Sequence, residues 1–409
     1  MPPPANWGAM RETPEPHLWS PTDGTRPSVG KIGDVAAEAG LERIHVLAWR
    51  DAADVESGGS ELHASMICRL WAAAGIEVTM RTSYAQGSPP ETVRDGYHVI
   101  RRAGRYLVFP RAAIAELTGR HGERDGLVEI WNGMPFFTPL WARGPRVVFL
   151  HHLHTAMWPL VVPPRLARAG QILERDLAPM LYQRTSVITL SESSKAMLVD
   201  RTRLRADLVH VVPPGVSEIY EPGDGRSPDP LFVAVGRLMP SKRLDALIAM
   251  VAEARARVPI RLVLVGEGYE RESLERTISD LDADGWCELR GHVSETDLIH
   301  LYRSAWAVMS ASISEGWGMT ITEAAACATP SIATRIAGHI DAVHHDLTGL
   351  LADDDAEMVD HMVRLAEDPG LRDRLGDAAR RESTRFTWER TAHDTLAVLA
   401  ADLVRRRGH

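Results

Sequence analysis

The chain has 409 residues, 44% of them apolar, and a net charge of −9 at pH 7. This length favours two domains of a globular protein, and lysines and arginines that are spread along the chain indicate no nucleic-acid partner. Three scattered cysteines are too few for a disulfide framework or a zinc site, and no stretch supplies the roughly 20 apolar residues of a membrane-spanning helix.

Residues 1–40 are predicted to be a disordered leader. The first 28 residues hold seven prolines and no apolar run, so they lack the features of a secretory signal. We therefore expect a cytoplasmic protein, with peripheral contact to the inner membrane face as the alternative.

From about residue 41, strand and helix signals alternate. Apolar runs predict buried strands at 44–49, 77–80, 127–130, 146–150 and 186–190. Between the first two lies a helix with an apolar stripe, and Gly75 ends it. This alternation predicts a parallel sheet that is covered by helices on both faces.

A stretch rich in proline and glycine at 214–230 interrupts this pattern and is predicted to be a linker. Beyond it, further strands are predicted at 231–235, 260–265, 287–289, 307–309 and 331–333. We therefore expect two Rossmann-like domains, 41–213 and 231–387, with a cleft between them and a last helix at 388–409 that packs back on the first domain. Ligands of parallel sheets collect outside the carboxyl ends of the strands.

Two glutamates, Glu315 and Glu323, stand with seven residues between them. Gly316 and Gly318 lie just ahead of a helix that is predicted to begin near Thr320, so unpaired backbone N–H groups would face a ligand there. Such a helix N-terminus suits a phosphate, and the glutamates could accept hydrogen bonds from sugar and ribose hydroxyls. The alternative is a capping glutamate and a solvated helix residue.

Two cations, Arg237 and Lys242, follow the strand predicted at 231–235. An arginine and a lysine at the end of a strand can bracket one diphosphate. The alternative is a pair of solvated surface cations.

Taken together, these motifs resemble glycosyltransferase family 4, whose members are retaining enzymes with the two-domain GT-B fold. The resemblance runs from about residue 44 to residue 388. It rests on Gly58-Gly59, Arg237, Lys242, Val265-Gly266-Glu267-Gly268, Arg290-Gly291-His292-Val293-Ser294, the glutamate pair and Ala326-Cys327-Ala328-Thr329-Pro330. Ala328 stands where family members commonly have glycine, so the sequence departs from the family pattern in this turn.

The resemblance implies roles for these positions. Arg237 and Lys242 would contact the donor phosphates, and Glu315 would contact the donor sugar. The expected donor-binding residues are Gly59 at the phosphates, His292 and Val293 at the base, Gly316, Gly318, Met319 and Thr320 at the helix start, and Glu323 at the ribose.

Three histidines follow the strand predicted at 146–150, and the family places one active-site histidine there. We favour His151, with His152 next and His154 third, so the expected catalytic set is His151, Arg237, Lys242 and Glu315. A metal site is the rival interpretation, but no carboxylate is close enough in sequence to complete one. The aspartates at 353–355 are expected to cap a helix that starts near residue 356. We therefore expect neither a metal nor another cofactor.

The expected function is transfer of a sugar from a nucleotide diphosphate sugar to an unidentified acceptor, with retention of configuration. UDP is favoured over GDP, and the acceptor is a glycan, a lipid or a small natural product. One alternative is a nucleotide-sugar-binding protein without transfer activity. A weaker one is an NAD-dependent oxidoreductase, since Gly266-Glu267-Gly268 follows a strand, although Arg271 occupies the third glycine position of that fingerprint.

Arginines are frequent between residues 165 and 205, where an anionic membrane could attach, and we interpret them as a solvated face.

Overall fold

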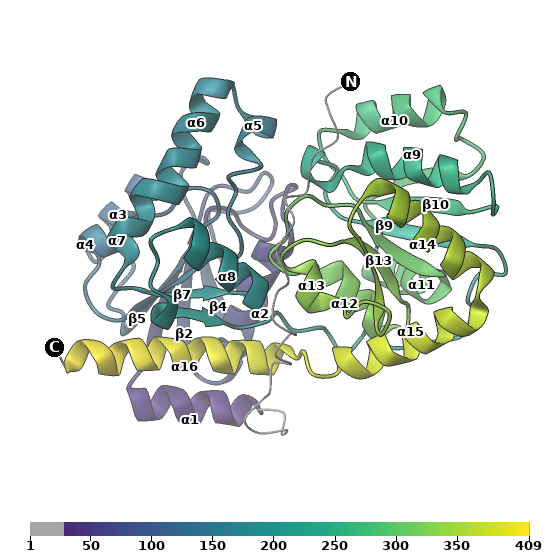
Figure 1. Ribbon diagram of the computed structural model, residues 1–409. Helices are drawn as coiled ribbons and strands as arrows, with labels where there is room; N and C mark the ends of the chain where they lie inside the picture. Colours follow the sequence, from purple (N-terminus) through teal and green to yellow (C-terminus); the bar gives the residue numbers. More distant parts are fainter. Residues whose placement is uncertain (1–27, 409) are drawn as a thin grey trace. The chain divides into compact units, whose positions relative to one another are not determined.

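The computed structural model describes residues 28–408, which divide into two compact units. The amino-terminal unit holds residues 28–218, 314–319 and 384–408, and the carboxyl-terminal unit holds 219–313 and 320–383. Each unit is built on its own sheet with helices packed on it (Figure 1). This confirms the predicted α/β class with two Rossmann-like domains.

The amino-terminal unit contains an eight-stranded sheet in the order β3-β4-β2-β1-β5-β6-β7-β8, and only the β3–β4 pair is antiparallel. Its strands, in chain order, are β1 (Arg43–Leu47), β2 (Glu77–Thr82), β3 (Glu91–Arg94), β4 (Tyr97–Arg101), β5 (Gly126–Ile130), β6 (Arg146–Phe149), β7 (Ser186–Thr189) and β8 (Val209–Val211). All five strands predicted for this part of the chain are confirmed. The β3–β4 hairpin and β8 were not predicted.

Helices cover both faces of this sheet, because successive residues of its strands point to opposite sides. Val147 and Phe149 join a core with helices α1, α2 and α16, whereas Val148 joins a second core with α7 and α8. The helices are α1 (Val29–Ala39), α2 (Gly59–Ala73), α3 (Val108–Leu117), α4 (Thr138–Trp141), α5 (Trp158–Val161), α6 (Pro164–Ile172), the π-helical turn η1 (Leu173–Leu177), α7 (Ala178–Tyr182), α8 (Glu192–Arg201), the 3₁₀ turn η2 (Ala206–Leu208) and α16 (Trp388–Arg407).

Helix α1 corrects the predicted disordered leader. Residues 1–27 lie outside the described residues, but 29–39 are helical. Ile32 and Ala36 are buried in the core shared with α2 and α16, and this apolar contact explains why the segment is ordered.

The last helix, α16, belongs to the amino-terminal unit. Its buried Asp402 accepts a hydrogen bond from the Arg146 backbone N–H at 2.9 Å, and the Trp71 indole donates to the Ala392 carbonyl at 3.0 Å. The unit also takes in residues 384–387, which the sequence assigned to the second domain, because the Val216 N–H donates to the Phe386 carbonyl at 3.1 Å.

The carboxyl-terminal unit contains a six-stranded parallel sheet in the order β11-β10-β9-β12-β13-β14. The strands are β9 (Leu231–Val235), β10 (Arg261–Val265), β11 (Cys287–Gly291), β12 (Ala307–Ser310), β13 (Ser331–Thr334) and β14 (Gly349–Ala352). The strand order reverses between β9 and β12, and in such sheets ligands bind outside the carboxyl ends of the strands at that switch point.

Helices cover both faces of this sheet as well, since Phe232 and its neighbour Val233 belong to different cores. The helical segments are η3 (Pro240–Lys242), α9 (Leu244–Ala254), α10 (Arg271–Asp280), α11 (Glu295–Ser304), α12 (Met319–Ala326), α13 (His339–Ala342), α14 (Asp355–Glu367) and α15 (Pro369–Ser383). Among residues 28–408, every helix is too short or too polar to cross a bilayer.

Candidate active site

In the carboxyl-terminal unit, the two predicted phosphate-binding cations follow β9. Arg237 and Lys242 are both half-buried, and Lys242 ends the 3₁₀ turn η3. A Cβ atom on Gly236 would lie 3.4 Å from Lys242 Cε, so the lysine side chain runs back over the end of β9. The structure therefore brings a lysine and an arginine to the carboxyl end of the first strand of this sheet.

A backbone hydrogen bond fixes the lysine loop at the switch point of the sheet. The Ile313 N–H donates to the carbonyl of buried Ser241 at 2.9 Å, which joins the loop after β9 to the segment after β12. Lys242 thus lies beside the place where the strand order reverses. Anionic ligands of parallel α/β sheets bind in this position.

The glycines after β10 serve close packing between two loops. Gly266 has φ +140°, and a Cβ atom there would lie 1.9 Å from the Gly236 carbonyl oxygen. A Cβ atom on Gly268 would lie 2.2 Å from the Leu238 carbonyl oxygen. Only glycine fits both positions. Close packing therefore explains why glycine occurs at both ends of Gly266-Glu267-Gly268. This pattern needs no NAD-binding role to account for it.

Glu323 on α12 is a half-buried carboxylate beside two tyrosines. Its Oε2 accepts a hydrogen bond from the Tyr302 hydroxyl at 2.9 Å, and the ring of Tyr220 lies 5.9 Å from that of Tyr302. Burial raises the pKa of Glu323 to about 7; the nearby Glu295 carboxylate adds to this rise, and the Tyr302 hydrogen bond opposes it. Val293 packs against the same core, so the residues predicted for the ribose and the base share one neighbourhood.

In the amino-terminal unit, the loop of Glu315 is held at the carboxyl ends of β6 and β7. The Gly316 carbonyl accepts hydrogen bonds from the hydroxyls of Ser191 at 3.2 Å and Ser194 at 3.3 Å. A Cβ atom on Gly316 would lie 2.6 Å from the His151 carbonyl oxygen, so glycine is needed for this close approach. Glu315 is half-buried, and the residue next to it, Gly316, is in contact with the predicted His151.

His151 forms a buried pair with a second histidine. Its Nε2 lies 3.2 Å from Nδ1 of His63 on α2. Burial, together with the nearby imidazoles of His152 and His154, lowers the pKa of His151 to about 3. The ring is therefore neutral near pH 7, so it can exchange hydrogen bonds but brings no positive charge to a substrate.

The predicted glycine loop forms the start of α2. The Gly58 N–H donates to Glu61 Oε2 at 2.9 Å, and Glu61 is in turn paired with buried Arg50 at 3.2 Å. A Cβ atom on Gly59 would lie 3.2 Å from the Met319 sulfur. The helix start is thus fixed by an ion pair, and Gly59 lies next to another predicted donor-binding residue.

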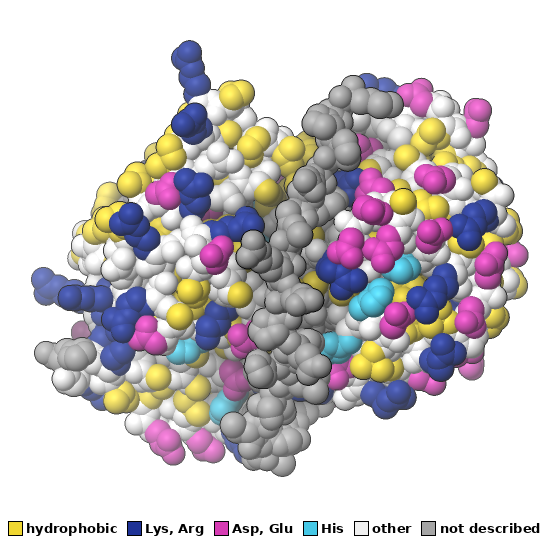
Figure 2. Space-filling view, in the orientation of Figure 1, with side chains coloured by type: hydrophobic (Ala, Val, Ile, Leu, Met, Phe, Trp, Pro, Cys, Tyr) yellow, Lys and Arg dark blue, Asp and Glu magenta, His cyan; other side chains and the backbone are white. Residues whose placement is uncertain are grey.

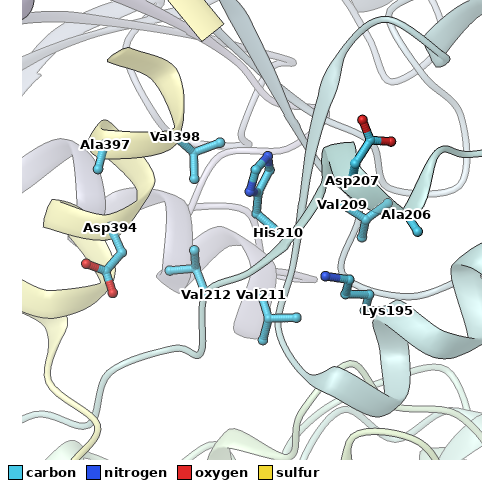
Figure 3. Close-up of a pocket in the computed structure, with 10 residues that line it drawn as sticks. All are labelled: Lys195, Ala206, Asp207, Val209, His210, Val211, Val212, Asp394, Ala397 and Val398. Carbon is cyan, nitrogen blue, oxygen red and sulfur yellow. The ribbon is translucent and has the colours of Figure 1, made fainter. Parts of the chain in front are cut away.

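A cavity of about 400 Å³ in the same unit is separate from these residues (Figure 3). Val398 and Asp394 of α16 line it on one side, and Lys195 of α8 and His210 of β8 line it on the other. None of the predicted site residues lines this cavity, so it is not the site that the sequence indicates.

Comparison with known proteins follows this two-part division. The model described as Glycosyltransferase Family 4 matches residues 57–218, and the one described as Glycosyl transferases group 1 matches residues 218–382. A D-inositol 3-phosphate glycosyltransferase of Frankia alni is 31% identical over 384 residues, which cover 83% of this chain and 94% of the relative. The chain belongs to glycosyltransferase family 4.

Solved structures show that this family 4 glycosyltransferase has the GT-B fold. Sucrose-phosphate synthase of Thermosynechococcus elongatus superposes with a TM-score of 0.77 at 20% identity, covering 90% of this chain and 99% of that one. Anabaena HepE in complex with UDP and glucose gives a TM-score of 0.64 at 19% identity, covering 87% and 98%.

The predicted site residues of the glycosyltransferase divide evenly between its units. Arg237, Lys242, His292, Val293, Thr320 and Glu323 lie in the carboxyl-terminal unit, and Gly59, His151, Glu315, Gly316, Gly318 and Met319 lie in the other. Within the units, the structure brings His151 to Gly316, Gly59 to Met319, and Glu323 to the core of Val293. Their roles toward the donor remain predictions.

Sequence reasoning missed three partners that hold these residues. His63 faces His151, Tyr302 faces Glu323, and Ser191 holds the Gly316 carbonyl. Ser191 could have been found as the N-cap of a helix, because serine after a strand and before a helix is a capping signal. The other two are distant in sequence from their partners and leave no local signal.

Among the described residues, one side-chain group of the glycosyltransferase has the spacing of a metal site: His45, Glu116 and His121. Glu116 already accepts hydrogen bonds from both imidazoles at 2.9 Å and from Arg124 at 2.7 Å. Burial alone would raise the pKa of Glu116, but these bonds outweigh it and lower the pKa. Because Arg124 neutralises the carboxylate, a divalent cation here would leave uncompensated buried charge, and we interpret the group as a structural network.

Another buried carboxylate, Glu174 in the π-helical turn η1, organises the third histidine. Glu174 Oε1 accepts from the His154 backbone N–H at 2.9 Å and lies 3.0 Å from His154 Nδ1, while Oε2 accepts from the Trp158 indole at 3.0 Å. The side chain of Glu174 is fully buried. The His154 side chain is therefore turned toward this carboxylate.

We expect Glu174→Gln to lower the free energy of unfolding by about 1–3 kcal/mol, because an amide has one acceptor oxygen for three donors. Urea denaturation checks this value. Asp176→Asn is the matched control, since Asp176 pairs with Arg175 on the surface and its loss should cost at most about 1 kcal/mol. Equal effects of the two substitutions would mean that Glu174 does not organise this region.

Proposed function

We propose that this enzyme transfers a sugar from UDP-sugar to a hydroxyl acceptor with retention of configuration. One observation carries the proposal. The loop that holds Lys242 is hydrogen-bonded to the segment after β12, at the switch point of the carboxyl-terminal sheet. A preorganised cation at this position is what a diphosphate leaving group requires.

The chemistry needs charge stabilisation rather than a strong acid. As the bond between the anomeric carbon and the phosphate oxygen breaks, Arg237, Lys242 and the amides at the start of α12 would stabilise the negative charge that grows on the diphosphate. In the proposed route the acceptor oxygen attacks from the same face, and the departing phosphate oxygen takes the acceptor proton. A covalent sugar–enzyme intermediate would need a carboxylate beneath the anomeric carbon.

UDP is proposed as the nucleotide because UDP is the nucleotide bound in solved relatives such as Anabaena HepE. The test is a panel of UDP- and GDP-sugars scored by release of nucleoside diphosphate, since slow hydrolysis of the true donor needs no acceptor. Release from a UDP-sugar alone supports the proposal. Binding of UDP without release from any sugar donor would favour the alternative of a binding protein.

A phosphorylated polyol is the first acceptor that we propose, because relatives that match most of this chain are named D-inositol 3-phosphate glycosyltransferases. A glycan, a lipid and a small natural product are the other classes to include. Acceleration of nucleotide release by one acceptor, with NMR detection of the anomeric configuration of the product, identifies the acceptor and tests retention together.

We also propose that catalysis needs no divalent metal, since Arg237 and Lys242 can supply the positive charge that a metal supplies in other enzymes. Donor hydrolysis should therefore keep its rate in excess EDTA. Manganese and magnesium added back serve as the control. Loss of activity in EDTA that either ion restores would contradict this charge assignment.

A further inference from the structure

The outer face of helices α5 to α7 exposes an unusual number of large apolar side chains. Of the 21 such side chains that are exposed among the described residues, six lie between residues 160 and 181, whereas the whole carboxyl-terminal unit exposes four. The six are Leu160, Leu166, Ile172, Leu177, Met180 and Leu181. In Figure 2, apolar side chains follow the outline of the molecule where Figure 1 places α6 and α7.

Five of these side chains lie on the exposed side of a continuous helical segment, residues 164–182. Buried residues of this segment recur every three or four positions, at Ala167, Gly170, Glu174, Ala178 and Tyr182, and therefore share one side. The exposed side is broad, since Leu166 and Ile172, six residues apart in α6, point about 120° away from each other. Leu166 is 61% exposed there and Leu177 54%, and we call the five side chains the apolar stripe.

The opposite side of the same segment is fixed to the protein, so the apolar stripe cannot turn inward. Gly170 packs against the Trp158 ring, Glu174 holds His154, and the Tyr182 hydroxyl donates to buried Glu129 at 2.7 Å. Because these contacts anchor the segment at three points along its length, exposure of the outer side chains is a stable property of the unit.

Arginines accompany the apolar stripe. Arg165 and Arg168 are exposed and make no ion pair within the described residues, and Arg175 is exposed and pairs with Asp176. Asp176 is the one carboxylate at the surface of this segment, since Glu174 is buried. An apolar stripe bordered by unpaired cations matches a surface with apolar chains beneath anionic headgroups.

We propose that this face, the six apolar side chains with Arg165, Arg168 and Arg175, docks on an anionic phospholipid bilayer. The leucines would enter the boundary between headgroups and acyl chains, and the arginines would contact lipid phosphates.

Sedimentation of the full chain with lipid vesicles tests this inference. Binding is expected to vesicles that contain about one third phosphatidylglycerol, to be weaker with phosphatidylcholine alone, and to fall with added salt. Arg165→Glu with Arg168→Glu should weaken binding by about 30-fold or more, as expected for losing two cations at an anionic surface. Leu166→Gln with Leu177→Gln should weaken it by about 10-fold or more.

The matched control is Arg276→Glu with Leu281→Gln, an exposed pair on the carboxyl-terminal unit that should bind vesicles like the natural chain. Thermal denaturation and donor hydrolysis, which should be unchanged in all three variants, separate lost docking from lost folding or lost function. The inference is overturned if no vesicle is bound, or if the control loses binding as much as the other variants. It is also overturned if light scattering shows that the natural chain self-associates and that the leucine variant does not, because the face would then be a protein interface.

Discussion

Alanine in place of Arg237 or Lys242 should lower kcat by about 100-fold or more. Loss of one preorganised group that stabilises transition-state charge typically has this cost. The Lys242 side chain lies over the end of β9, and its loop is bonded to the segment after β12. The ammonium group is therefore held in place before the donor arrives, so its contribution should appear in the chemical step.

Steady-state donor hydrolysis with each variant measures the effect, and Lys195→Ala and Arg276→Ala are the matched controls. Lys195 is a half-buried lysine of α8, and Arg276 is an exposed arginine of α10 in the same unit as Arg237. Both controls should keep near-normal turnover. A stably folded Lys242→Ala enzyme with normal turnover would contradict the proposed contact between Lys242 and the donor phosphates.

The regular part of the fold was predictable because apolar runs of parallel strands are a local signal. The strands predicted at 231–235 and 331–333 correspond to β9 and β13 almost residue for residue. The β3–β4 hairpin was missed although its turn carries a local signal: Asp95 and Gly96 both have positive φ, as a two-residue hairpin turn demands. An Asp-Gly pair between two short strands is therefore a sequence signal for this hairpin.

One helix cap and one turn of the carboxyl-terminal unit can be compared with the sequence. Asp354 caps α14 by accepting from the Glu357 N–H at 2.8 Å, as the aspartate run indicated. Ala328, where the family commonly has glycine, keeps the left-handed conformation at φ +59°. An alanine in that conformation costs about 1–2 kcal/mol, so this turn is a specific site of backbone strain.

The environment of the site could not be predicted, since it depends on contacts between distant residues. Neither the partial burial of Glu323 nor the pairing of His151 with His63, 88 residues away, has a sequence signature. The same is true of the apolar stripe on α6 and α7. Whether Leu166 is core or surface depends on which side of its helix meets the sheet.

The raised pKa of half-buried Glu323 predicts that stability and nucleotide binding respond to pH in opposite directions. Because its pKa is raised from 4.5 to about 7, the stability it lends is present below its ordinary pKa and lost as pH rises through 7. Glu323→Gln, which stays neutral, should therefore be more stable than the natural enzyme at pH 8, by up to about 3 kcal/mol, and similar to it below pH 4.5. Thermal denaturation at both pH values checks this.

The same substitution should weaken UDP binding by about 1–3 kcal/mol in calorimetry at pH 8, the scale for losing a charged hydrogen-bond partner. The ribose does not change during the reaction, so the loss should fall mainly on KM. For the natural enzyme, affinity should rise as pH increases through about 7 and the carboxylate ionises. The nucleotide phosphate also titrates near this pH, so the difference between the natural enzyme and Glu323→Gln isolates the carboxylate.

Glu315→Gln should have the opposite profile, with near-normal UDP binding and a fall in kcat. Its loop is anchored through Gly316 to Ser191, Ser194 and the His151 backbone, so the substitution should not displace the loop. UDP carries no sugar, and the proposed partner of Glu315 is the sugar, whose charge and ring shape change as the bond breaks. Two measurements on both glutamine variants test this division of roles. They are calorimetry with UDP and turnover of the donor. If Glu315→Gln weakens UDP binding as much as Glu323→Gln does, the two glutamates do not divide the donor in this way.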